Sequence, residues 1–506
     1  MNKHRLAMIV IFAAALLRFA DALRPIDHAS WRECDEGSIS RNFAVEGMNP
    51  LTPQIDWRGS GPGYAEMELP LYPFLTAVTY KIFGIHDEIG RMWSLLFSLG
   101  ALIFFFKLAR ECLNETAAVI ALAFIAFNPL MTETATSIQP ESLMIFAYIT
   151  AVYFFIKWLR TDRAADFWVS TAMTALAILA KAPATHIGLF FGILLLQKYG
   201  LKVIKQRRVW LFGILTVLPA GLWYLHAKRL WTTYGNSLGV SNEYHWIGWD
   251  FFNDPNFVGG ILRSEFLYVW VVFGMIAGAF ALWRGPREEP AKHALLWLAS
   301  IFAFYLIAAR TTSQDWASYY HVFSIPPVAL IFGFGAKKLW DYAGEFTDKF
   351  SRRSTLINLG RVFVMFVIVA SIFATFLTEA KQVRASYLNH RVAEPAFVWA
   401  KSIKPKLTND GLIIASGGHC VDKNGYALAY NASYMFYWLD RKGWNVCVED
   451  QSSDNIHVFV TQGAKYFVAE RSLLNEKPGF EDDLRRDYSL LDESDGFLLF
   501  DLTQRR

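Results

Sequence analysis

The sequence predicts a polytopic α-helical membrane protein with a C-terminal extracytoplasmic α/β domain. Of its 506 residues, 54% are hydrophobic and only 19% are charged, whereas soluble proteins carry about a quarter charged residues. The apolar residues gather in repeated runs of about 17 to 25 residues, the length that crosses the hydrocarbon core of a bilayer. From about residue 380, short apolar strands alternate with helical patterns. The net charge of +4 says little about nucleic acid, because the basic residues follow the predicted membrane topology, and no nucleic-acid partner is expected.

The first apolar segment, residues 1–23, has a basic start and ends in Ala20-Asp21-Ala22. This end loosely fits the small-x-small site of a cleaved signal peptide. Arg18 interrupts the apolar run, however, and many further spans follow it. We therefore expect an uncleaved first helix with a cytoplasmic N-terminus, and the signal peptide remains the alternative.

Ten further spans are expected, which gives about eleven transmembrane helices and places the C-terminus on the side opposite the N-terminus. They cover residues 89–109, 115–135, 141–159, 166–180, 184–200, 209–227, 263–283, 293–309, 321–336 and 361–378. Basic residues gather at alternate connections, which the positive-inside rule assigns to the cytoplasm. The division of 166–200 into two spans depends on the short segment Lys181-Ala-Pro183.

The predicted catalytic loop spans residues 24–84. Its first part, to about residue 65, is expected to be a polar loop, and residues 66–84 are expected to form a helix along the interface. The polar part contains the carboxylates Asp35 and Glu36, which in an arbitrary outer loop are ordinarily just solvated. The functional alternative is a general base that takes the proton of an acceptor hydroxyl while its oxygen attacks a sugar's anomeric carbon. That displacement needs only the base if the leaving group is a lipid phosphate, which is stable as an anion.

A phosphate leaving group needs cations at the outer face. The candidates are Arg41, Lys181, Lys228, Arg229 and Arg310. Arginine grips a phosphate with two hydrogen bonds, and lysine supplies a point charge. The alternative for each candidate is that it anchors a helix end by snorkelling.

Aromatic and acidic residues also reach the predicted outer face. Tyr319, Tyr320 and His321 enter a span there, and they either form an aromatic belt or donate hydrogen bonds to the phosphate or sugar. Glu133 and Glu141 flank an outer turn, where they shape a polar cavity or cap helix ends.

The predicted soluble domain covers residues 379–506, after a transmembrane domain at 1–378. Its expected strands are 412–415, 455–460, 465–469 and 496–500, and its expected helices are 394–403 and 427–439. Cys420 and Cys447 lie in this region and form a disulfide if it is extracytoplasmic, or else remain two unpaired thiols. No cysteine spacing fits a zinc site.

Several short motifs follow one another along the chain in an order that resembles that of a known family. They are Asp-Glu at 35–36, Glu-Leu-Pro-Leu-Tyr-Pro-Phe-Leu at 68–75, Asn-Pro at 128–129, Lys181, and Ser-Tyr-Tyr-His-Val-x-x-Ile-Pro-Pro at 318–327. The sequence resembles the protein mannosyltransferase-like branch of the glycosyltransferase C superfamily. That branch includes the bacterial transferases that add aminoarabinose to lipid A, whose layout this chain shares over most of its length.

The resemblance implies a polyprenyl-phosphate-linked sugar donor, inversion at the anomeric carbon, and Asp35 as the base. Glu36 then orients Asp35 or contacts the acceptor. The lipid A aminoarabinose transferases carry a lysine just before the proline of the amphipathic helix, where this chain has Leu69. Glu66 and Glu68 lie nearby, and we assign them with Glu141 to the acceptor or cavity. Some relatives bind a divalent metal near the phosphate, but the residues here form no convincing ligand set, so no cofactor is predicted.

We therefore expect a glycosyltransferase of a bacterial inner membrane. It would move a hexosyl or pentosyl group from the lipid donor to lipopolysaccharide, another glycan or a protein. The alternative is a lipid or solute transporter without chemistry, which should show two related halves of spans with charged or broken helices at the midplane. No such halves are recognisable. A third reading, an inactive scaffold with an outer interaction domain, would tolerate the loss of both carboxylates.

Overall fold

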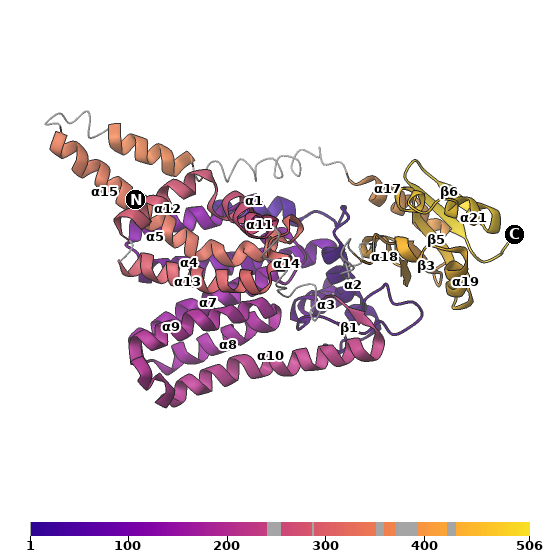
Figure 1. The fold of residues 1–506 in the computed structure, drawn as a ribbon, viewed down its shortest axis with the longest axis horizontal. Helices are drawn as coiled ribbons and strands as arrows, with labels where there is room; N and C mark the ends of the chain where they lie inside the picture. Colours follow the sequence, from indigo (N-terminus) through magenta and orange to yellow (C-terminus); the bar gives the residue numbers. More distant parts are fainter. Residues whose placement is uncertain are drawn as a thin grey trace. The chain divides into compact units, whose positions relative to one another are not determined.

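The structure is a computed structural model that describes residues 2–239, 255–285, 288–350, 359–370, 372, 393–421 and 432–506 (Figure 1). The chain forms two compact units, each assembled from segments far apart in sequence. The helical unit contains residues 1–23, 91–222 and 245–390, and the mixed unit contains residues 24–90, 223–244 and 391–506. The predicted domains, 1–378 and 379–506, are divisions along the sequence and remain predictions.

The helical unit consists of long apolar helices joined by short connections. Its helices are α1 (Lys3–Ala22), α5 (Glu115–Ala126), α6 (Pro129–Thr136), α7 (Glu141–Thr161), α8 (Ala164–Ala180), α9 (Ile187–Tyr199), α11 (Pro255–Ser264), α12 (Val272–Arg284), α13 (Glu289–Ile307), α14 (Ala309–Thr312) and α15 (Ile325–Phe350), together with most of α4 (Asp87–Cys112) and the first part of α10 (Arg207–Tyr234). Short 3₁₀- or π-helical segments connect several of them, namely η1 (Ala182–His186), η2 (Gly200–Lys205), η5 (Glu265–Trp270) and η6 (Asp315–Ser324).

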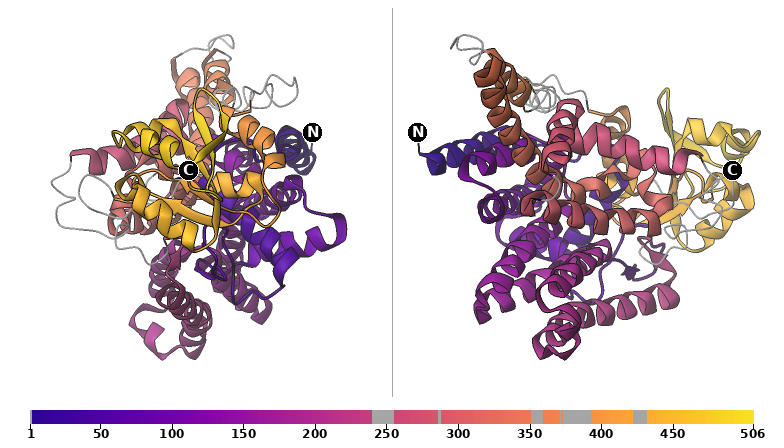
Figure 2. Two further views of the ribbon diagram at one scale, coloured as in Figure 1. Left: turned by 90° about the vertical axis from the view of Figure 1, so that its right-hand side faces the viewer. Right: turned by 60° about the vertical axis from the view of Figure 1, so that its left-hand side comes forward.

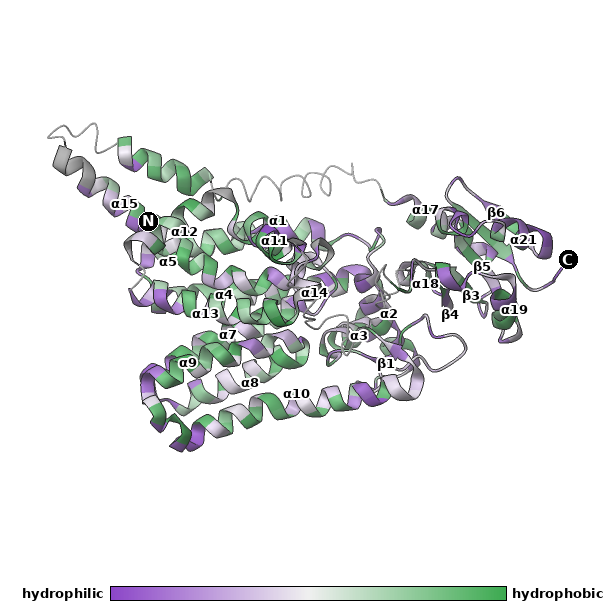
Figure 3. Ribbon diagram, viewed as in Figure 1, coloured by the Kyte–Doolittle hydropathy of each residue, from purple (hydrophilic) through white to green (hydrophobic). Residues whose placement is uncertain are grey.

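Six helices among the described residues are long and apolar enough to cross a membrane, or up to eight if each of two bent pairs is one span. Hydrophobic residues run along most of α9 and α10 in Figure 3. The expected count of about eleven is therefore not confirmed. The helix α1 forms where a span is expected, but the charged residues Arg5, Arg18 and Asp21 interrupt its apolar sequence. The helix α8 has only 17 residues, and residues 371 and 373–378 of the expected span 361–378 lie outside the described residues.

Two of the predicted spans are bent. The axes of α5 and α6 differ by 58°, because Asn128 stops one helix and starts the next. Its side-chain oxygen accepts hydrogen bonds from the backbone N–H groups of Leu130 and Met131, and Pro129 occupies the first helical position. The predicted span 263–283 is likewise bent where η5 meets α12, at Val271, whose φ is +49°.

The predicted break between residues 166 and 200 is confirmed. The helix α8 ends at Ala180, Lys181 is extended with φ −158° and ψ 112°, and η1 and α9 follow. Proline cannot donate a backbone hydrogen bond in a helix interior, and Pro183 lies in the turn η1. The break places Lys181 at a helix end.

The core of the helical unit forms around α15, which packs against α5, α12 and α13. Glycines permit this close packing. A Cβ atom at Gly333 would lie 2.4 Å from the carbonyl oxygen of Ala117, and one at Gly335 would lie 2.0 Å from that of Ala277. Small residues that let helix backbones approach one another are typical of membrane helix contacts.

The mixed unit begins with a helix, α2 (Trp31–Glu46), in the segment predicted to be a polar loop. That prediction is wrong for these residues. The hydroxyl of Ser30 accepts a hydrogen bond from the N–H of Glu33 and starts the helix. Few apolar residues mark it, because most of its buried side chains are polar or charged. Ile39, Phe43 and Ala44 are among the exceptions, and they join a small core with residues of α3 (Leu71–Phe83).

The C-terminal part of the mixed unit contains a five-stranded sheet of order β4-β3-β5-β7-β6, drawn in yellow in Figure 2. Its strands are β3 (Leu412–Ser416), β4 (Gly443–Val446), β5 (Ala464–Glu470), β6 (Ser489–Glu493) and β7 (Phe497–Asp501). The strand β3 runs parallel to β4 and β5, whereas β7 is antiparallel to β5 and β6. Three of the predicted strands correspond to β3, β5 and β7 and are confirmed, whereas β4 and β6 were not predicted. A separate parallel pair joins β1 (Ala65–Glu66) to β2 (Asn236–Ser237).

Helices of the same unit lie on both faces of this sheet. Ile414, Phe467 and Phe500 share a core with residues of α19 (Ser453–Thr461), α20 (Arg471–Asn475) and α21 (Phe480–Asp487). Because side chains alternate along a strand, their neighbours point to the opposite face. The helices α17 (Pro395–Ile403) and α18 (Ser433–Leu439) also contact the sheet. The former matches the expected helix 394–403, and the latter matches the described part of 427–439.

One predicted strand is wrong, because residues 455–460 belong to the helix α19. The side chain of Ser452 accepts a hydrogen bond from the N–H of Asn455 and caps the helix. The alternation of apolar residues that predicted a strand also fits a short helix, in which Ile456 is the buried residue.

The two cysteines of the C-terminal region are paired rather than free. Cys420 and Cys447 form a disulfide, with their Cα atoms 5.5 Å apart. The bond ties the segment after β3 to the end of β4.

Candidate functional site

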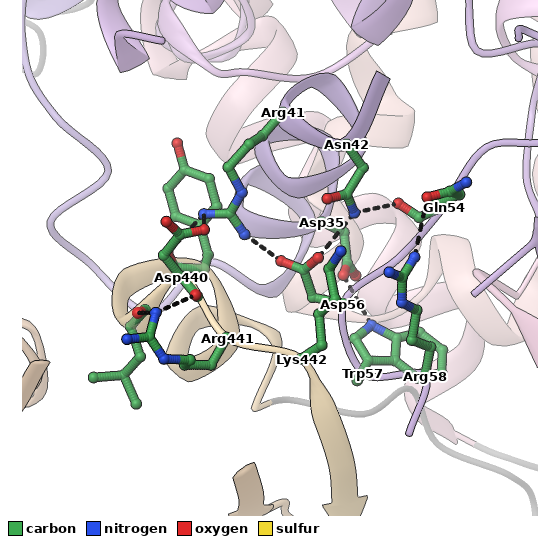
Figure 4. A network of polar contacts seen from close by, with 12 residues as sticks. Asp35, Arg41, Asn42, Gln54, Asp56, Trp57, Arg58, Asp440, Arg441 and Lys442 are labelled. Atoms are coloured by element: carbon green, nitrogen blue, oxygen red, sulfur yellow. Dashed lines mark hydrogen bonds and ion pairs between the residues drawn. The ribbon is translucent and has the colours of Figure 1, made fainter. Parts of the chain in front are cut away.

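The predicted base, Asp35, lies on the second turn of α2 in a nearly closed environment. Its side chain is only 2% exposed. The indole N–H of Trp57 donates a hydrogen bond to Asp35 Oδ1 over 2.9 Å (Figure 4). Trp57 was not predicted as a site residue, and no sequence spacing points to it. The neutral indole N–H of Trp57 fixes the Asp35 carboxylate in place but does not neutralise its charge.

The surroundings of Asp35 raise its pKa to about 7. Burial is the main cause, since a carboxylate loses its hydration in the interior. The charge of Asp56 raises the pKa further, whereas the hydrogen bond from Trp57 and the charge of Arg32 lower it. Asp35 is therefore a carboxyl group whose charge changes near neutral pH.

Glu36, the second member of the pair, is fully buried beside Arg32. Arg32 Nη2 lies 3.1 Å from Glu36 Oε1 and 2.6 Å from Glu68 Oε2. Arg32 was not among the predicted site residues. Its spacing of four residues from Glu36 would indicate an ion pair only if the segment were recognised as a helix. The structure thus brings Glu36 and the predicted Glu68 together through this guanidinium.

Arg41, predicted as a phosphate ligand, is engaged by acids of the same unit. Its guanidinium pairs with Asp56 and lies 2.9 Å from Asp440 Oδ1 (Figure 4). The guanidinium carbon also lies 5.2 Å from the ring centroid of Tyr437. Asn42 donates a 2.8 Å hydrogen bond to the other oxygen of Asp56. These contacts tie the second half of α2 to the neighbouring segments of the mixed unit.

Glu66, predicted to contact the acceptor or to line the cavity, lies in the short strand β1. It is fully buried, and the hydroxyl of Ser237 in β2 donates a 2.5 Å hydrogen bond to Glu66 Oε2. This bond reinforces the pairing of the two strands. Its part in binding an acceptor remains a prediction.

In the helical unit, four predicted residues come together as the Lys181 group, namely Lys181, Glu141, Tyr319 and Tyr320. The ammonium of Lys181 lies 2.5 Å from Glu141 Oε1. It also lies 5.2 Å and 5.6 Å from the ring centroids of Tyr319 and Tyr320. Both Lys181 and Glu141 are almost completely buried. The two rings and Glu141 stabilise the ammonium, so that an anionic head group would bind Lys181 in competition with Glu141.

His321 follows the two tyrosines in sequence but points into the protein. It is fully buried, with Nδ1 2.8 Å from Glu265 Oε1 and Nε2 2.9 Å from the carbonyl oxygen of Thr312. Both ring nitrogens are thus engaged by the helical unit itself. These contacts fit a role in positioning η6 rather than contact with a ligand.

Two of the remaining predicted cations, Lys228 and Arg229, are not brought into either group. Lys228 and Arg229 are exposed near the end of α10. Arg310 lies in the short helix α14.

The described residues offer little for a metal ion. One set of three possible ligands lies close together among them, formed by Cys420, Cys447 and Glu449. The two sulfurs of this set are joined in the disulfide, so neither is a thiolate ligand.

The resemblance indicated by the sequence is supported by two comparisons, since a family model matches part of the chain and solved structures share its fold. Residues 67–224 match the family model of dolichyl-phosphate-mannose-protein mannosyltransferases. No curated protein matches the chain in sequence.

Two solved structures illustrate the similarity. ArnT from Cupriavidus metallidurans, crystallised with undecaprenyl phosphate, is 16% identical with a TM-score of 0.59, and the match covers 97% of each chain. The Archaeoglobus fulgidus oligosaccharyltransferase, tethered to an acceptor peptide, is 12% identical with a TM-score of 0.59. That match covers 98% of this chain and 74% of the archaeal one. At these identities the likeness concerns the fold.

Proposed function

We propose that this chain is a membrane glycosyltransferase that moves a sugar from a polyprenyl-phosphate donor to an extracytoplasmic acceptor, with inversion at the anomeric carbon. The observation that carries the proposal is the buried carboxylate of Asp35, with its pKa near 7 and its neutral donor Trp57. A general base works best when its pKa lies close to the pH at which it operates. The likeness in fold to transferases supports the same reaction class.

The proposed step is a single displacement. Asp35 takes the proton of an acceptor O–H group while that oxygen forms a bond to the anomeric carbon. The bond from this carbon to the phosphate oxygen breaks, and polyprenyl phosphate leaves with the bonding electron pair. Trp57 keeps one carboxylate oxygen occupied, so that the other is available for the proton. Glu36 and Arg32 hold the first turns of α2 in place.

The leaving phosphate needs a cation, and we assign that role to Lys181. Its ammonium is a compact charge beside Tyr319 and Tyr320, whose hydroxyl groups are able to donate hydrogen bonds to phosphate oxygens. Arg41 suits the role less well, because Asp56 and Asp440 already bind its guanidinium. In this proposal the phosphate competes with Glu141 for Lys181.

The acceptor side of the reaction is proposed to be extracytoplasmic. A disulfide between Cys420 and Cys447 supports this location, because such bonds persist in oxidising compartments such as the periplasm. The acceptor would be lipopolysaccharide, another glycan or a protein of that compartment, in a bacterial inner membrane with a cytoplasmic N-terminus.

The direct test uses the full chain reconstituted in liposomes with labelled polyprenyl-phosphate mannose, glucose or aminoarabinose and a membrane extract as acceptor. Release of polyprenyl phosphate together with a labelled acceptor is the expected result. Transport of the donor across the bilayer without release would instead support a transporter. Glu46→Gln, on the same helix as Asp35, is the matched control and should leave turnover unchanged. Mass spectrometry of surface glycolipids and glycoproteins from a deletion strain would then identify the acceptor.

A further inference from the structure

A cavity of about 300 Å³ lies within the mixed unit, apart from the carboxylates of Asp35 and Glu36. Its lining consists of Pro25, Ile26, Arg41, Ile85, Asp87, Phe397, Lys401, Lys404, Tyr437, Trp438 and Asp440. The volume is at the lower end of the range for small-molecule sites. It suits a ligand group of roughly one sugar unit.

Interlocking hydrogen bonds hold the inner wall of the cavity. The backbone N–H of Ile26 donates to Asp87 Oδ2 over 2.8 Å, and the hydroxyl of Tyr437 donates to the other oxygen of Asp87. The indole of Trp438 donates to the carbonyl of Ile26 over 2.7 Å. Both acceptor oxygens of Asp87 are therefore used by the protein. A wall fixed in this way needs little reorganisation when a ligand binds.

Positive charge is concentrated at one side of the cavity. Lys401 and Lys404, three residues apart at the end of α17, line it with Arg41. The neighbouring acid, Asp440, lies 2.9 Å from Arg41 and 4.0 Å from Lys404. Arg41 is also paired with Asp56, and both oxygens of Asp87 accept hydrogen bonds from Tyr437 and Ile26. Lys401 and Lys404 are therefore the lining cations best able to receive an anion.

Aromatic rings form another part of the lining. Phe397 and Trp438 meet edge to face with centroids 5.4 Å apart, and both line the cavity with Tyr437. Aromatic rings offer apolar faces together with polar edges. Cations that grip an anion beside apolar ring faces fit a sugar that carries a phosphate or carboxylate group.

We propose that this cavity binds an anionic sugar unit of the acceptor, remote from the hydroxyl group that receives the transferred sugar. Lys401 and Lys404 bind the anionic group, and Phe397 and Trp438 cover the sugar ring. That the ligand belongs to an acceptor rests on the proposed transferase function. The preference of the cavity for an anionic sugar does not depend on that function.

The lysines' surroundings support the assignment. Burial, followed by the charges of Arg41, Arg441 and Lys401, lowers the pKa of Lys404, and Asp440 offsets this only in part. A bound anion would relieve this repulsion. The alternative is that both lysines only stabilise the carbonyl end of α17, which would require no ligand.

The test measures binding of mannose 6-phosphate, mannose and inorganic phosphate to the full purified chain by titration calorimetry at low salt. Wild-type protein should bind mannose 6-phosphate about tenfold more tightly than it binds mannose or inorganic phosphate. Mannose lacks the contacts of the phosphate with the lysines, and inorganic phosphate lacks the contacts of the sugar with the aromatic rings. The double variant Lys401→Gln/Lys404→Gln should bind mannose 6-phosphate about tenfold more weakly than wild type does. Lys465→Gln, which removes an exposed ion pair with Asp410, is the matched control and should bind as wild type does.

Three outcomes would overturn the proposal: equal binding of mannose and mannose 6-phosphate, equal binding of inorganic phosphate and mannose 6-phosphate, or unchanged binding in the double variant. Asp35→Asn should bind the sugar phosphate normally while losing transfer. If binding follows the expected pattern and no chain transfers sugar, the proposed function fails and the anion site stands. If transfer occurs without this binding pattern, the site alone fails.

Discussion

Asp35 and Glu141 are both carboxylates that are 2% exposed, and their neighbours differ. Asp35 receives a hydrogen bond from the neutral indole of Trp57, whereas Glu141 lies against the ammonium of Lys181. A neutral donor leaves the cost of burying the charge largely uncompensated, so the pKa of Asp35 rises. A cation compensates that cost directly. The comparison distinguishes a carboxylate ready to accept a proton from one that keeps a cation in place.

The largest expected effect follows from removing the proton acceptor. Asp35→Asn keeps the shape and the bond from Trp57 but cannot take a proton. Turnover should fall on the order of 10³-fold, measured as release of polyprenyl phosphate. Glu36→Gln should cost less, because Glu36 contacts Arg32 rather than the proposed reacting atoms. Equal losses in the two variants would contradict the assignment of Asp35 as the base.

The next effect concerns the Lys181 group. Lys181→Met should lower kcat/KM about 100-fold, since a charge-assisted hydrogen bond to the phosphate is lost. The variant also leaves Glu141 buried beside an apolar side chain, which lowers stability. The double variant Lys181→Met/Glu141→Gln should recover the melting temperature but not the activity. Recovered activity would show that Lys181 serves only the fold.

A third effect separates stability from activity at Asp35. Its pKa is about 7 in the fold against 3.8 for the free side chain, so the native protein binds this proton more tightly than the unfolded chain. The resulting penalty is absent below pH 3.8, grows between pH 3.8 and 7, and is complete above pH 7. Asp35→Asn should therefore melt higher than wild type at pH 8, by an amount corresponding to about 4 kcal/mol. The two should melt alike near pH 4, and a lower melting temperature at pH 8 would contradict the raised pKa.

The smallest effect is a shift of the pH profile. Trp57 lowers the pKa of Asp35, so Trp57→Phe should raise it and move the acid limb of kcat/KM upward by about one unit. Activity at pH 7 would fall about fivefold and recover at pH 8.5. If the acid limb of the pH profile stayed at the same pH in Trp57→Phe, the group that titrates there would be one other than Asp35.

The sequence predicted most of the long helices, because apolar runs of membrane length leave few alternatives. It also gave Asp35, Glu36 and Lys181 as candidate site residues, the last at the predicted break between two spans, and these roles remain predictions. It failed for α2, whose buried residues are mainly polar and give no apolar period. It failed again at residues 455–460, where one short pattern fits both a strand and a helix. The sequence did not predict the contact of Trp57 with Asp35, since these two residues are brought together only by folding.

By itself, therefore, the sequence determined the membrane class of this chain, the order of its motifs and the identity of its candidate base. The tertiary structure decided which charges are compensated. Arg32 binds Glu36 and Arg41 binds Asp56, whereas Asp35, among the residues that the structure describes, receives a hydrogen bond from a neutral indole N–H at 2.9 Å. The physical reason is that a side chain's pKa depends on burial and on neighbours within a few ångströms. Those neighbours come from segments that only the fold brings together.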